Sequence, residues 1–409
     1  MLVRLCRILC NLRLRFFSNF DQVNMSRKIS KREFLRRSLW CAGGAALGLK
    51  SAEVLAKLSG MNHETVNQDG GFGRFSKESP YGIVTPKGVR CLICPNQCTL
   101  TEGNESLCRT KVAKDGKLYT LAYGNPCSIH VDPIEKKPLF HFYPSSKSFS
   151  VAIAGCTLAC LNCQNWEISQ VGPRETRNYD LFPEALVDKA AASGAISIAY
   201  TYSEPVAFYE YMYDSAKLAR KRGLKNVLVS NGYINEKPLR ELAPYIDGAN
   251  INLKSFSEEI YQNLNGGHLA PILRTLKILH EMGVWLEITN LIVPGWTDKP
   301  EMIREMCSWL VNNGLEDCPL HFSRFFPLYQ LTNLPFTPLA ILEEAHDIAK
   351  KAGLKYVYIG NVPNHKTENT YCPKCNNVVL ERKGFSILAT NLKEGKCGFC
   401  GMRIEGRWG

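Results

Sequence analysis

Hydrophobic and polar residues follow two alternating periods along most of the chain. Short, nearly continuous apolar runs are typical of buried strands. They occupy residues 149–154, 196–200, 226–229, 249–253, 284–292, 320–322 and 355–359. Between these runs, apolar residues recur every three or four positions, as in amphipathic helices, at 184–193, 206–221, 271–281, 301–312 and 339–352. Regular alternation of strands and helices predicts a parallel sheet with helices packed outside it.

The number of repeats narrows the fold. Six or seven strand–helix units joined by right-handed crossovers favour a partial or full β/α barrel over an open doubly wound sheet. No phosphate-cradling glycine fingerprint follows the first strand, which counts against a dinucleotide-binding fold. In β/α barrels the active site gathers at the carboxyl ends of the strands. The residues that follow each predicted strand are therefore the ones to inspect for chemistry.

Three cysteines lie directly after the first predicted strand. Cys156, Cys160 and Cys163 are separated by three and then two residues, so a single loop can bring their thiolates to one point. A closed iron–sulfur or structural zinc site takes four protein ligands, and the next cysteine, Cys307, is far along the chain. The pattern therefore predicts a metal cluster with an open position, which a substrate or cosubstrate needs in order to bind metal directly.

A second group of cysteines precedes the first strand. It consists of Cys91, Cys94, Cys98 and Cys108. Four thiolates at these spacings make a closed site for either a structural zinc ion or an auxiliary 4Fe–4S cluster. Gly103 and Asn104 supply the turn that brings the last of them back. Cys127 is left over, and we expect it in the core.

A third group of cysteines lies near the C-terminus. It consists of Cys372, Cys375, Cys397 and Cys400. Two Cys-x2-Cys knuckles in a β-rich loop are typical of a tetrahedral metal site, either a zinc ribbon or a rubredoxin-like iron site. A unit of ~40 residues buries too little surface to fold without its ion. Its basic residues are scattered without aromatic interleaving, so we expect it to dock on the barrel or a protein partner.

Composition and charge add little until the charge is located. The chain has 409 residues, 45% hydrophobic and 22% charged, as in ordinary globular proteins. Its net charge of +12 suggests nucleic acid, but residues 1–60 contribute +9 of it and leave only +3 for the rest. This distribution of charge excludes an extended nucleic-acid-binding face. Seventeen cysteines in metal-ligand spacings indicate reduced thiols and assembly in a reducing compartment.

Residues 1–60 are typical of a leader. Residues 1–20 contain four arginines and no acidic residue, as in an amphipathic transit segment. The alternative is that translation starts at Met25. From Ser30 the chain reads Ser-Lys-Arg-Glu-Phe-Leu-Arg-Arg, which resembles a twin-arginine signal with Lys31 in place of the first arginine. No apolar run approaches the ~18 residues of a confident membrane-spanning helix.

The cysteine spacing after a first barrel strand resembles that of the radical S-adenosylmethionine (SAM) enzymes, near the activating enzymes of pyruvate formate-lyase and other glycyl-radical enzymes. The most similar family is the radical SAM enzyme of the AmmeMemoRadiSam system. The likeness extends from about residue 88 to the end of the chain. It is carried by Cys-Gln-Asn-Trp-Glu-Ile-Ser-Gln at 163–170, Asp-Pro-Ile-Glu-Lys-Lys-Pro-Leu at 132–139, Leu-His-Phe-Ser-Arg-Phe-Phe-Pro at 320–327 and Tyr-Ile-Gly-Asn-Val-Pro at 358–363.

This resemblance implies roles for residues that follow the strands. The three loop cysteines would hold a 4Fe–4S cluster, and SAM would bind the open iron. Glu204 stands where the family uses a Gly-Gly-Glu-like segment for the methionyl ammonium, although the glycines are missing. Ser230 and Asn231 resemble part of an Asp-Thr-Asn-Gly segment of the activases. They are expected to contact SAM as well.

Three further residues complete the implied SAM site. Lys254, in an Asn-Leu-Lys segment that resembles Asp-Leu-Lys, would face the SAM carboxylate, with an exposed lysine as the alternative. His321 ends the sixth strand, where the activases place a histidine near SAM, with a satisfied core histidine as the alternative. Asn162 replaces the aromatic residue often found before the third cysteine, so Tyr202 or Trp166 would have to stack on adenine.

The resemblance implies a radical SAM enzyme. The cluster would cleave SAM reductively and yield a 5′-deoxyadenosyl radical, which abstracts hydrogen from an unidentified substrate that could be a polypeptide. The implied partners are a flavodoxin- or ferredoxin-type electron donor and a protein substrate or Memo-type neighbour. One alternative is a non-catalytic electron-transfer or scaffold protein with three metal sites. Another is a radical enzyme guided to nucleic acid by the C-terminal knuckles, which predicts strongly salt-dependent binding.

These assignments divide the chain into five parts. They are a leader at 1–60, a linker at 61–87, an N-terminal Cys-rich metal module at 88–145, a radical SAM partial (β/α)6-type TIM barrel at 146–366 and a four-cysteine zinc ribbon at 367–409. The need for SAM favours the cytoplasm or the inner face of the membrane. Export through the twin-arginine-like leader is the alternative.

Overall fold

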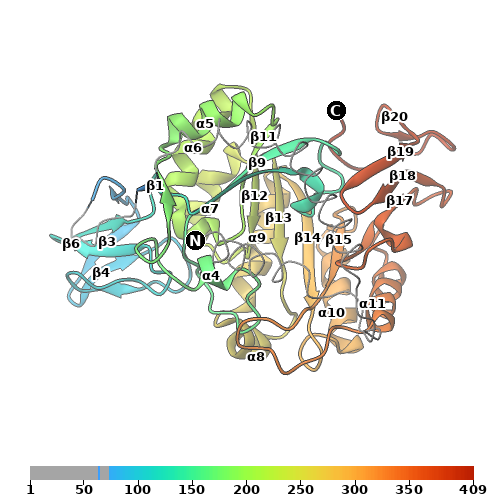
Figure 1. The fold of residues 1–409 in the computed structure, drawn as a ribbon. Coiled ribbons are helices and arrows are strands. Elements are labelled where there is room, and N and C mark those ends of the chain that lie inside the picture. The colour runs from blue at the N-terminus through green and yellow to red at the C-terminus, as the bar shows by residue number, and fades with distance from the viewer. Residues whose placement is uncertain (1–62, 65–72) are drawn as a thin grey trace, which may run out of the picture. The chain divides into compact units, whose positions relative to one another are not determined.

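The computed structural model describes residues 63–64 and 73–409, and an eight-stranded sheet runs through the middle of this part (Figure 1). The strand order is β16-β15-β14-β13-β12-β11-β9-β8. All neighbours from β9 to β16 are parallel, and β8 pairs antiparallel with β9 at one edge. The strands are β8 (Ser128–Pro133), β9 (Lys147–Ala152), β11 (Ser197–Tyr200), β12 (Lys225–Ser230), β13 (Gly248–Asn252), β14 (Trp285–Ile292), β15 (Leu320–Arg324) and β16 (Val357–Gly360).

Helices connect the parallel strands. They are α5 (Pro183–Ala192), α6 (Tyr209–Lys221), α7 (Glu236–Leu242), α9 (Leu269–Glu281), α10 (Pro300–Asn312) and α11 (Leu339–Ala352). Shorter helical turns are α4 (Trp166–Ser169), α8 (Glu258–Ile260), η1 (Ile134–Lys136), η2 (Pro205–Phe208), η3 (Ala243–Tyr245), η4 (Tyr261–Asn265) and η5 (Lys366–Glu368). Proline occupies the first turn of α5 and α10, where its missing N–H has no helical partner to lose.

The two faces of the sheet differ in chemistry because side chains alternate along each strand. One face carries Phe149, Ile198, Leu228, Ile251 and Ile288, which join the helices in the largest hydrophobic cluster. The other face, here called the inner face, carries small and polar side chains. These are Ser148, Ser150, Ser197, Asn250, Glu287, Thr289 and His321, all buried. The helices therefore cover one face, and the inner face retains polar groups suited to a site.

The N-terminal module is built from small antiparallel sheets at one end of the central sheet (Figure 1). Its strands are β2 (Lys77–Glu78), β3 (Gly82–Thr85), β4 (Gly88–Cys91), β5 (Thr99–Leu100), β6 (Lys111–Lys114) and β7 (Lys117–Thr120). They form the sheets β3-β4-β5 and β2-β7-β6. The short strands β1 (His63–Glu64) and β10 (Asn178–Tyr179) pair with each other.

The C-terminal unit lies at the other end of the sheet (Figure 1). Its strands are β17 (Thr370–Tyr371), β18 (Val378–Lys383), β19 (Ser386–Thr390), β20 (Leu392–Lys393) and β21 (Lys396–Cys397). Tyr356 and Tyr358, from the end of the central sheet, share a hydrophobic cluster with Val379 and Ile404 of this unit. Arg382 donates a hydrogen bond of 2.7 Å to the carbonyl of Phe140. The unit is therefore packed on the central sheet.

The predicted alternation of strands and helices is confirmed, including the parallel order of seven strands. Helix α7 and the antiparallel edge strand β8 were not predicted, and β8 lies in the segment assigned to the N-terminal module. The predicted leader at 1–60 lies outside the described residues. Within the described part, no helix combines the length and hydrophobicity needed to cross a membrane.

Candidate metal and active site

The loop after β9 carries the three cysteines. Gly155, just before Cys156, has a φ of +114°, and a β-carbon there would lie 2.5 Å from the carbonyl oxygen of Cys108. Only glycine therefore fits this approach of two backbones. The amides of Ala159 and Leu161 donate 2.9 Å hydrogen bonds to carbonyls at the end of η4, which fixes the loop around the second cysteine.

Amide side chains from two other segments contact the sulfurs of Cys156 and Cys160. The Nδ2 atom of Asn265, the last residue of η4, lies 3.3 Å from Cys160 Sγ. The Nδ2 atom of Asn231, which follows β12, lies 3.7 Å from Cys156 Sγ and 3.1 Å from Thr157 Oγ1. The backbone N–H of Leu158 points to Cys156 Sγ at 3.4 Å. These donors face sulfur atoms, as donors do around thiolates that bind metal.

Two charged side chains act on the cysteines. Burial raises the pKa of Cys156 well above its usual range, and the nearby Glu204 carboxylate raises it further. Burial alone would lower the pKa of Lys254, but the three cysteines and Glu204 outweigh burial and raise it. Lys254 is therefore held as a cation beside three groups that become anionic on binding metal.

Glu204 joins the loops after β11 and β12. Its Oε1 atom accepts hydrogen bonds from the Val206 amide at 3.0 Å and from Ser230 Oγ at 2.7 Å. Its Oε2 atom accepts one from the Asn231 amide at 2.8 Å. Burial raises the pKa of Glu204, and these three donors oppose the rise. The carboxylate therefore fixes the backbone of Asn231, whose side-chain amide contacts Cys156, and retains acceptor capacity on Oε2.

Tyr202 belongs to a separate buried network on the inner face. Its hydroxyl donates to Asp132, and the Lys137 ammonium lies 2.6 Å from the same carboxylate and 4.4 Å from the centre of the Tyr202 ring. Burial lowers the pKa of Lys137 to about 8, and Asp132 works against that shift. The carbonyl of Tyr202 accepts a 2.7 Å hydrogen bond from Asn165. This network ties β8 to the segment that follows the cysteines.

The predicted position of His321 at the end of its strand is wrong. His321 is the second residue of β15, and its Nε2 atom lies 2.7 Å from Glu287 Oε2. Its ring stacks on Tyr358 and meets Phe140 edge to face. Glu287 also accepts hydrogen bonds from the Phe140 and His141 amides. The alternative of a satisfied core histidine therefore describes its surroundings.

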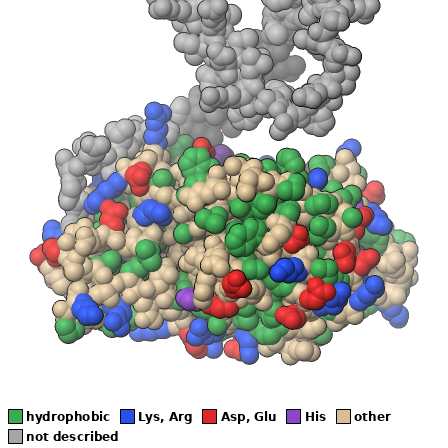
Figure 2. Space-filling view, turned by 90° about the horizontal axis from the view of Figure 1, so that it is seen from below, with side chains coloured by type: hydrophobic (Ala, Val, Ile, Leu, Met, Phe, Trp, Pro, Cys, Tyr) green, Lys and Arg blue, Asp and Glu red, His purple; other side chains and the backbone are tan. Residues whose placement is uncertain are grey.

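Aromatic side chains surround the segments next to the cysteine loop. Trp166 stacks on Tyr329 with ring centres 5.4 Å apart, and the Gln330 amide donates to the Leu161 carbonyl at 3.0 Å. The rim, defined as Trp166, Leu328, Tyr329 and Phe336, includes three of the exposed large hydrophobic side chains. Figure 2, which shows the molecule from below the view of Figure 1, has hydrophobic side chains between interspersed acidic and basic ones. No single sign of charge dominates this face.

The N-terminal cysteines also converge. The pKa of Cys94 is raised well above its usual range by burial and further by Cys108, Cys91 and Cys98. Cys108 Sγ lies 3.0 Å from the Ser106 hydroxyl and 3.1 Å from the Thr110 hydroxyl. The four thiols therefore form one group, here called the N-terminal quartet.

The four cysteines of the C-terminal unit, here called the C-terminal quartet, surround one point. Their sulfurs all lie within 4.8 Å of one another, with pairs at 3.6 and 3.7 Å. A tetrahedron with metal–sulfur bonds of about 2.3 Å has edges of about 3.8 Å. Each knuckle ends in a residue of positive φ, Asn376 at 56° and Gly401 at 74°. The spacing fits a single tetrahedral ion.

The structure brings together most of the predicted site. Glu204, Asn231 and Lys254 lie around the three loop cysteines, with Ser230 bonded to Glu204. Asn265 was missed because a lone asparagine carries no motif.

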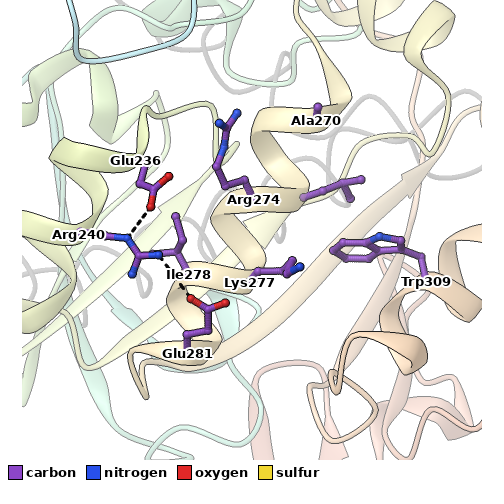
Figure 3. Close-up of a pocket in the computed structure, with 9 residues that line it drawn as sticks. Glu236, Arg240, Ala270, Arg274, Lys277, Ile278, Glu281 and Trp309 are labelled. Carbon is purple, nitrogen blue, oxygen red and sulfur yellow. Dashed lines mark hydrogen bonds and ion pairs between the residues drawn. The ribbon is translucent and has the colours of Figure 1, made fainter.

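A surface pocket on the outer helices contains none of these site residues. It is lined by residues of α7, α9 and α10, where Arg240 forms ion pairs with Glu236 and Glu281 (Figure 3).

Comparison with known proteins follows the same boundaries. Residues 150–310 match the model of the Radical SAM superfamily. Over 319 residues the chain is 44% identical to the uncharacterized protein MJ0808 of Methanocaldococcus jannaschii. The alignment covers 78% of this chain and 95% of that protein. The chain is a radical SAM protein of the same family as MJ0808.

This radical SAM protein has further relatives. It is 29% identical over 184 residues to the pyruvate formate-lyase 1-activating enzyme of Escherichia coli K12. The alignment covers 42% of this chain and 74% of that enzyme. The crystal structure of Streptococcus suis SuiB bound to SAM aligns with a TM-score of 0.42 and 15% identity, covering 59% of this chain and 56% of that one.

A radical SAM domain implies a 4Fe–4S cluster and SAM, and the residues at the cysteine loop fit both. Three thiols from one loop, a half-buried cation and two amide donors suit an anionic cluster with one iron left for another ligand. The nearby Glu204 is engaged by three donors of this chain. The C-terminal quartet offers a further metal site.

Proposed function

We propose that this radical SAM protein is an enzyme that cleaves SAM reductively and uses the resulting radical to abstract hydrogen from its substrate. The observation that carries the proposal is the surroundings of Cys156, Cys160 and Cys163, where the half-buried Lys254 interacts electrostatically with all three cysteines and amide donors contact two of the sulfurs. A bound 4Fe–4S cluster supplies the electron that splits SAM into methionine and a 5′-deoxyadenosyl radical.

The chain's own residues bind and orient the cosubstrate. Lys254 attracts the carboxylate of SAM, because its ammonium is kept charged by the three cysteines and Glu204. Glu204 Oε2 accepts one hydrogen bond within the chain, which leaves acceptor capacity for the methionyl ammonium. Asn231 and Asn265 hold the sulfurs of Cys156 and Cys160 in place.

The rim supports a polypeptide substrate. Three of its side chains, Trp166, Leu328 and Phe336, are exposed, and Trp166 stacks on Tyr329. Exposed aromatic and aliphatic side chains suit contact with a macromolecular partner better than with a small polar metabolite. A substrate bound there would lie beside the cysteine loop, to which the Gln330 amide is bonded.

Anaerobic reconstitution with iron and sulfide, reduction with dithionite and assay of 5′-deoxyadenosine test the proposal. The wild-type chain should form 5′-deoxyadenosine from SAM. Lys254→Met, which removes the cation and keeps most of the chain length, should raise the KM for SAM by about tenfold or more, since a charge-assisted hydrogen bond contributes about 1.5–3 kcal/mol. Lys277→Met, on an exposed position of α9, is the matched control.

A non-catalytic electron-transfer or scaffold protein would behave differently. It would reconstitute with iron and still form no 5′-deoxyadenosine, and SAM would leave its electron paramagnetic resonance (EPR) spectrum unchanged. Either result contradicts the proposed activity. Unchanged KM in Lys254→Met would contradict only the role assigned to the lysine.

The finer assignments belong to the same proposal. We place the protein in the AmmeMemoRadiSam type, with a leader at 1–60, a linker at 61–87, the Cys-rich module at 88–145, a partial (β/α)6-type barrel at 146–366 and a zinc ribbon at 367–409. Zinc suits the C-terminal quartet because four thiolates in a closed tetrahedron are its usual structural site. Iron in the same four thiolates is the alternative, and metal analysis separates the two.

The partners follow from the chemistry. Reduction of the cluster requires a one-electron donor of flavodoxin or ferredoxin type, and the further partner is either a protein substrate or a Memo-type protein. Nucleic acid is not favoured, since positive charge outside residues 1–60 amounts to +3.

A further inference from the structure

The N-terminal quartet directly adjoins the loop of Cys156, Cys160 and Cys163. The carbonyl of Cys108 lies against Gly155, at a position that a β-carbon would approach to 2.5 Å. On the other side of Cys156, Asn96 Nδ2 donates a 2.8 Å hydrogen bond to the carbonyl of Thr157. The residues before and after the first loop cysteine therefore both contact the segment that carries the quartet.

A second tie runs through the loop after β12. Asn235 Nδ2 donates to the carbonyls of Leu92 and Cys94 at 2.7 and 3.1 Å, and its amide donates to Ile93 at 2.9 Å. The same loop supplies Asn231, whose side chain contacts Cys156 Sγ. Residues 231–235 therefore contact both cysteine groups.

The spacing of its sulfurs distinguishes the N-terminal quartet from a site for a single metal ion. In the part of the chain that the structure describes, the C-terminal quartet is the only set of three or more potential ligands whose atoms all lie within 4.8 Å of one another. The sulfurs of the N-terminal quartet do not all lie within 4.8 Å of one another, and neither do those of the three loop cysteines. In a cubane each thiolate binds its own iron at a separate corner, so its sulfurs lie farther apart than four sulfurs around one ion.

The surroundings of the quartet suit an anionic group that changes charge. The hydroxyls of Ser106 and Thr110 lie within hydrogen-bonding distance of Cys108 Sγ, and polar groups near cluster sulfurs set the reduction potential. The Lys111 amide donates to the same Ser106 hydroxyl at 3.2 Å, and the buried Lys111 ammonium is paired with Glu210 at 2.6 Å.

We propose that Cys91, Cys94, Cys98 and Cys108 hold a second iron–sulfur cluster that passes electrons to the site at Cys156, Cys160 and Cys163. One electron enters from a reduced flavodoxin- or ferredoxin-type donor, which is oxidised by one electron, and the same electron leaves to the loop site. No bond forms or breaks in the protein and no proton is transferred. Cys98 is half-buried and Leu107 is exposed, so a donor can approach the quartet from solvent.

The identity of the metal in the N-terminal quartet can be tested by metal analysis and spectroscopy, without an activity assay. The triple variant Cys156→Ala, Cys160→Ala, Cys163→Ala, reconstituted anaerobically, should still bind about four iron and four sulfide per chain and give an EPR signal on reduction. Cys307→Ala, a buried cysteine of α10 outside all three groups, is the control for loss of a thiol. Zinc in place of iron in the triple variant would overturn the proposal.

The wild-type chain gives a second measure if the triple variant does not fold. Its Mössbauer spectrum should account for about eight iron atoms per chain in two distinguishable clusters. About four iron atoms, all perturbed by SAM, would overturn the second cluster in the intact protein.

The electron path rests on the proposed function and has its own test. In Cys94→Ser, Cys98→Ser, the rate of 5′-deoxyadenosine formation with reduced flavodoxin, divided by the rate with dithionite, should fall by about tenfold or more, because dithionite reaches the loop site directly. An unchanged ratio would overturn the path and leave the cluster in place. Wild-type protein that shows both clusters and forms no 5′-deoxyadenosine with any donor would instead contradict the proposed function.

Discussion

The C-terminal quartet and the cysteine loop after β9 use the same ligand atom for different ends. In the quartet, two knuckles from one small unit place four sulfurs around a point, with two pairs at 3.6 and 3.7 Å. In the loop, three sulfurs from one segment lie near charges and donors from other segments: Lys254 acts on all three cysteines, and Asn231 and Asn265 contact two of the sulfurs. The quartet supplies its full set of four ligands by itself, whereas the loop supplies three and depends on distant segments for the rest of its surroundings.

The largest expected effect separates the two regions by chemistry. Cys160→Ala removes one of the three sulfurs of the loop and should abolish 5′-deoxyadenosine formation, because two thiolates do not retain the cluster. The measurement is the amount of 5′-deoxyadenosine formed from SAM under dithionite. Cys307→Ala is the matched control. Retention of wild-type cleavage in Cys160→Ala would remove the basis for assigning the loop as the reactive site.

The second effect concerns stability. Cys375→Ala opens the C-terminal quartet and should lower the free energy of unfolding of this unit by about 4 kcal/mol or more, since a unit of this size depends on its ion. Thermal unfolding and limited proteolysis within residues 373–400 measure it.

Cleavage of SAM per folded molecule should survive this substitution. If Cys375→Ala and Cys160→Ala lost 5′-deoxyadenosine formation equally while both stayed folded, the contrast between the two regions would fail. Removal of the ion with a chelator provides the same comparison without a mutation.

The third effect uses a histidine between the two regions. Burial lowers the pKa of His141 to about 4, and its ring atoms lie 2.6 Å from the Glu405 carbonyl and the Tyr358 hydroxyl. An unfolded histidine has a pKa near 6.5. The unfolded state therefore binds the extra proton first, and stability present above pH 6.5 is lost as the pH falls toward 4.

Replacement by a residue that does not titrate should flatten that dependence. Between pH 8 and pH 5, His141→Gln should lose about 2 kcal/mol less unfolding free energy than the wild type. Protonation of the metal-binding thiols acts on both proteins and cancels in the difference. Equal losses would show that His141 is charged or accessible in the folded protein.

The smallest effect tunes the reactive site. Asn265→Leu keeps a similar volume and removes the donor to Cys160 Sγ. One hydrogen bond of about 1 kcal/mol corresponds to about 40 mV for a one-electron couple, and the potential should become more negative because the donor stabilises the reduced, more negative state. Potentiometric EPR titration measures it. Asn263→Leu, on the exposed side of the same turn, should leave the potential where it was.

The sequence predicted the strand–helix alternation because both periods are strong where one face of an element is buried. Predicted ranges such as 339–352 coincide with α11. The strand β8 was missed because it lies at a sheet edge and only Asp132 of its six residues is buried, so its sequence shows no alternation of apolar and polar positions. The cysteine groups were evident from spacing alone.

The rest of the site could not be predicted because it depends on contacts between distant segments. Asn265 reaches Cys160 across a separation of 105 residues, and nothing near it in the sequence marks that contact. The resemblance to the activases places His321 at the end of its strand, but β15 extends three residues beyond it, and the ring contacts the buried Glu287. Position along a strand decided the outcome, and local sequence does not fix it.

Gly155 gives the two cysteine loops a common weak point. The carbonyl behind Cys108 occupies the space that any side chain at residue 155 would need. Exchange for alanine would push on both backbones at once, so a single added methyl group should disturb iron retention in each region together. Assembly has the same constraint: neither loop can reach its final shape until the other is seated beside it.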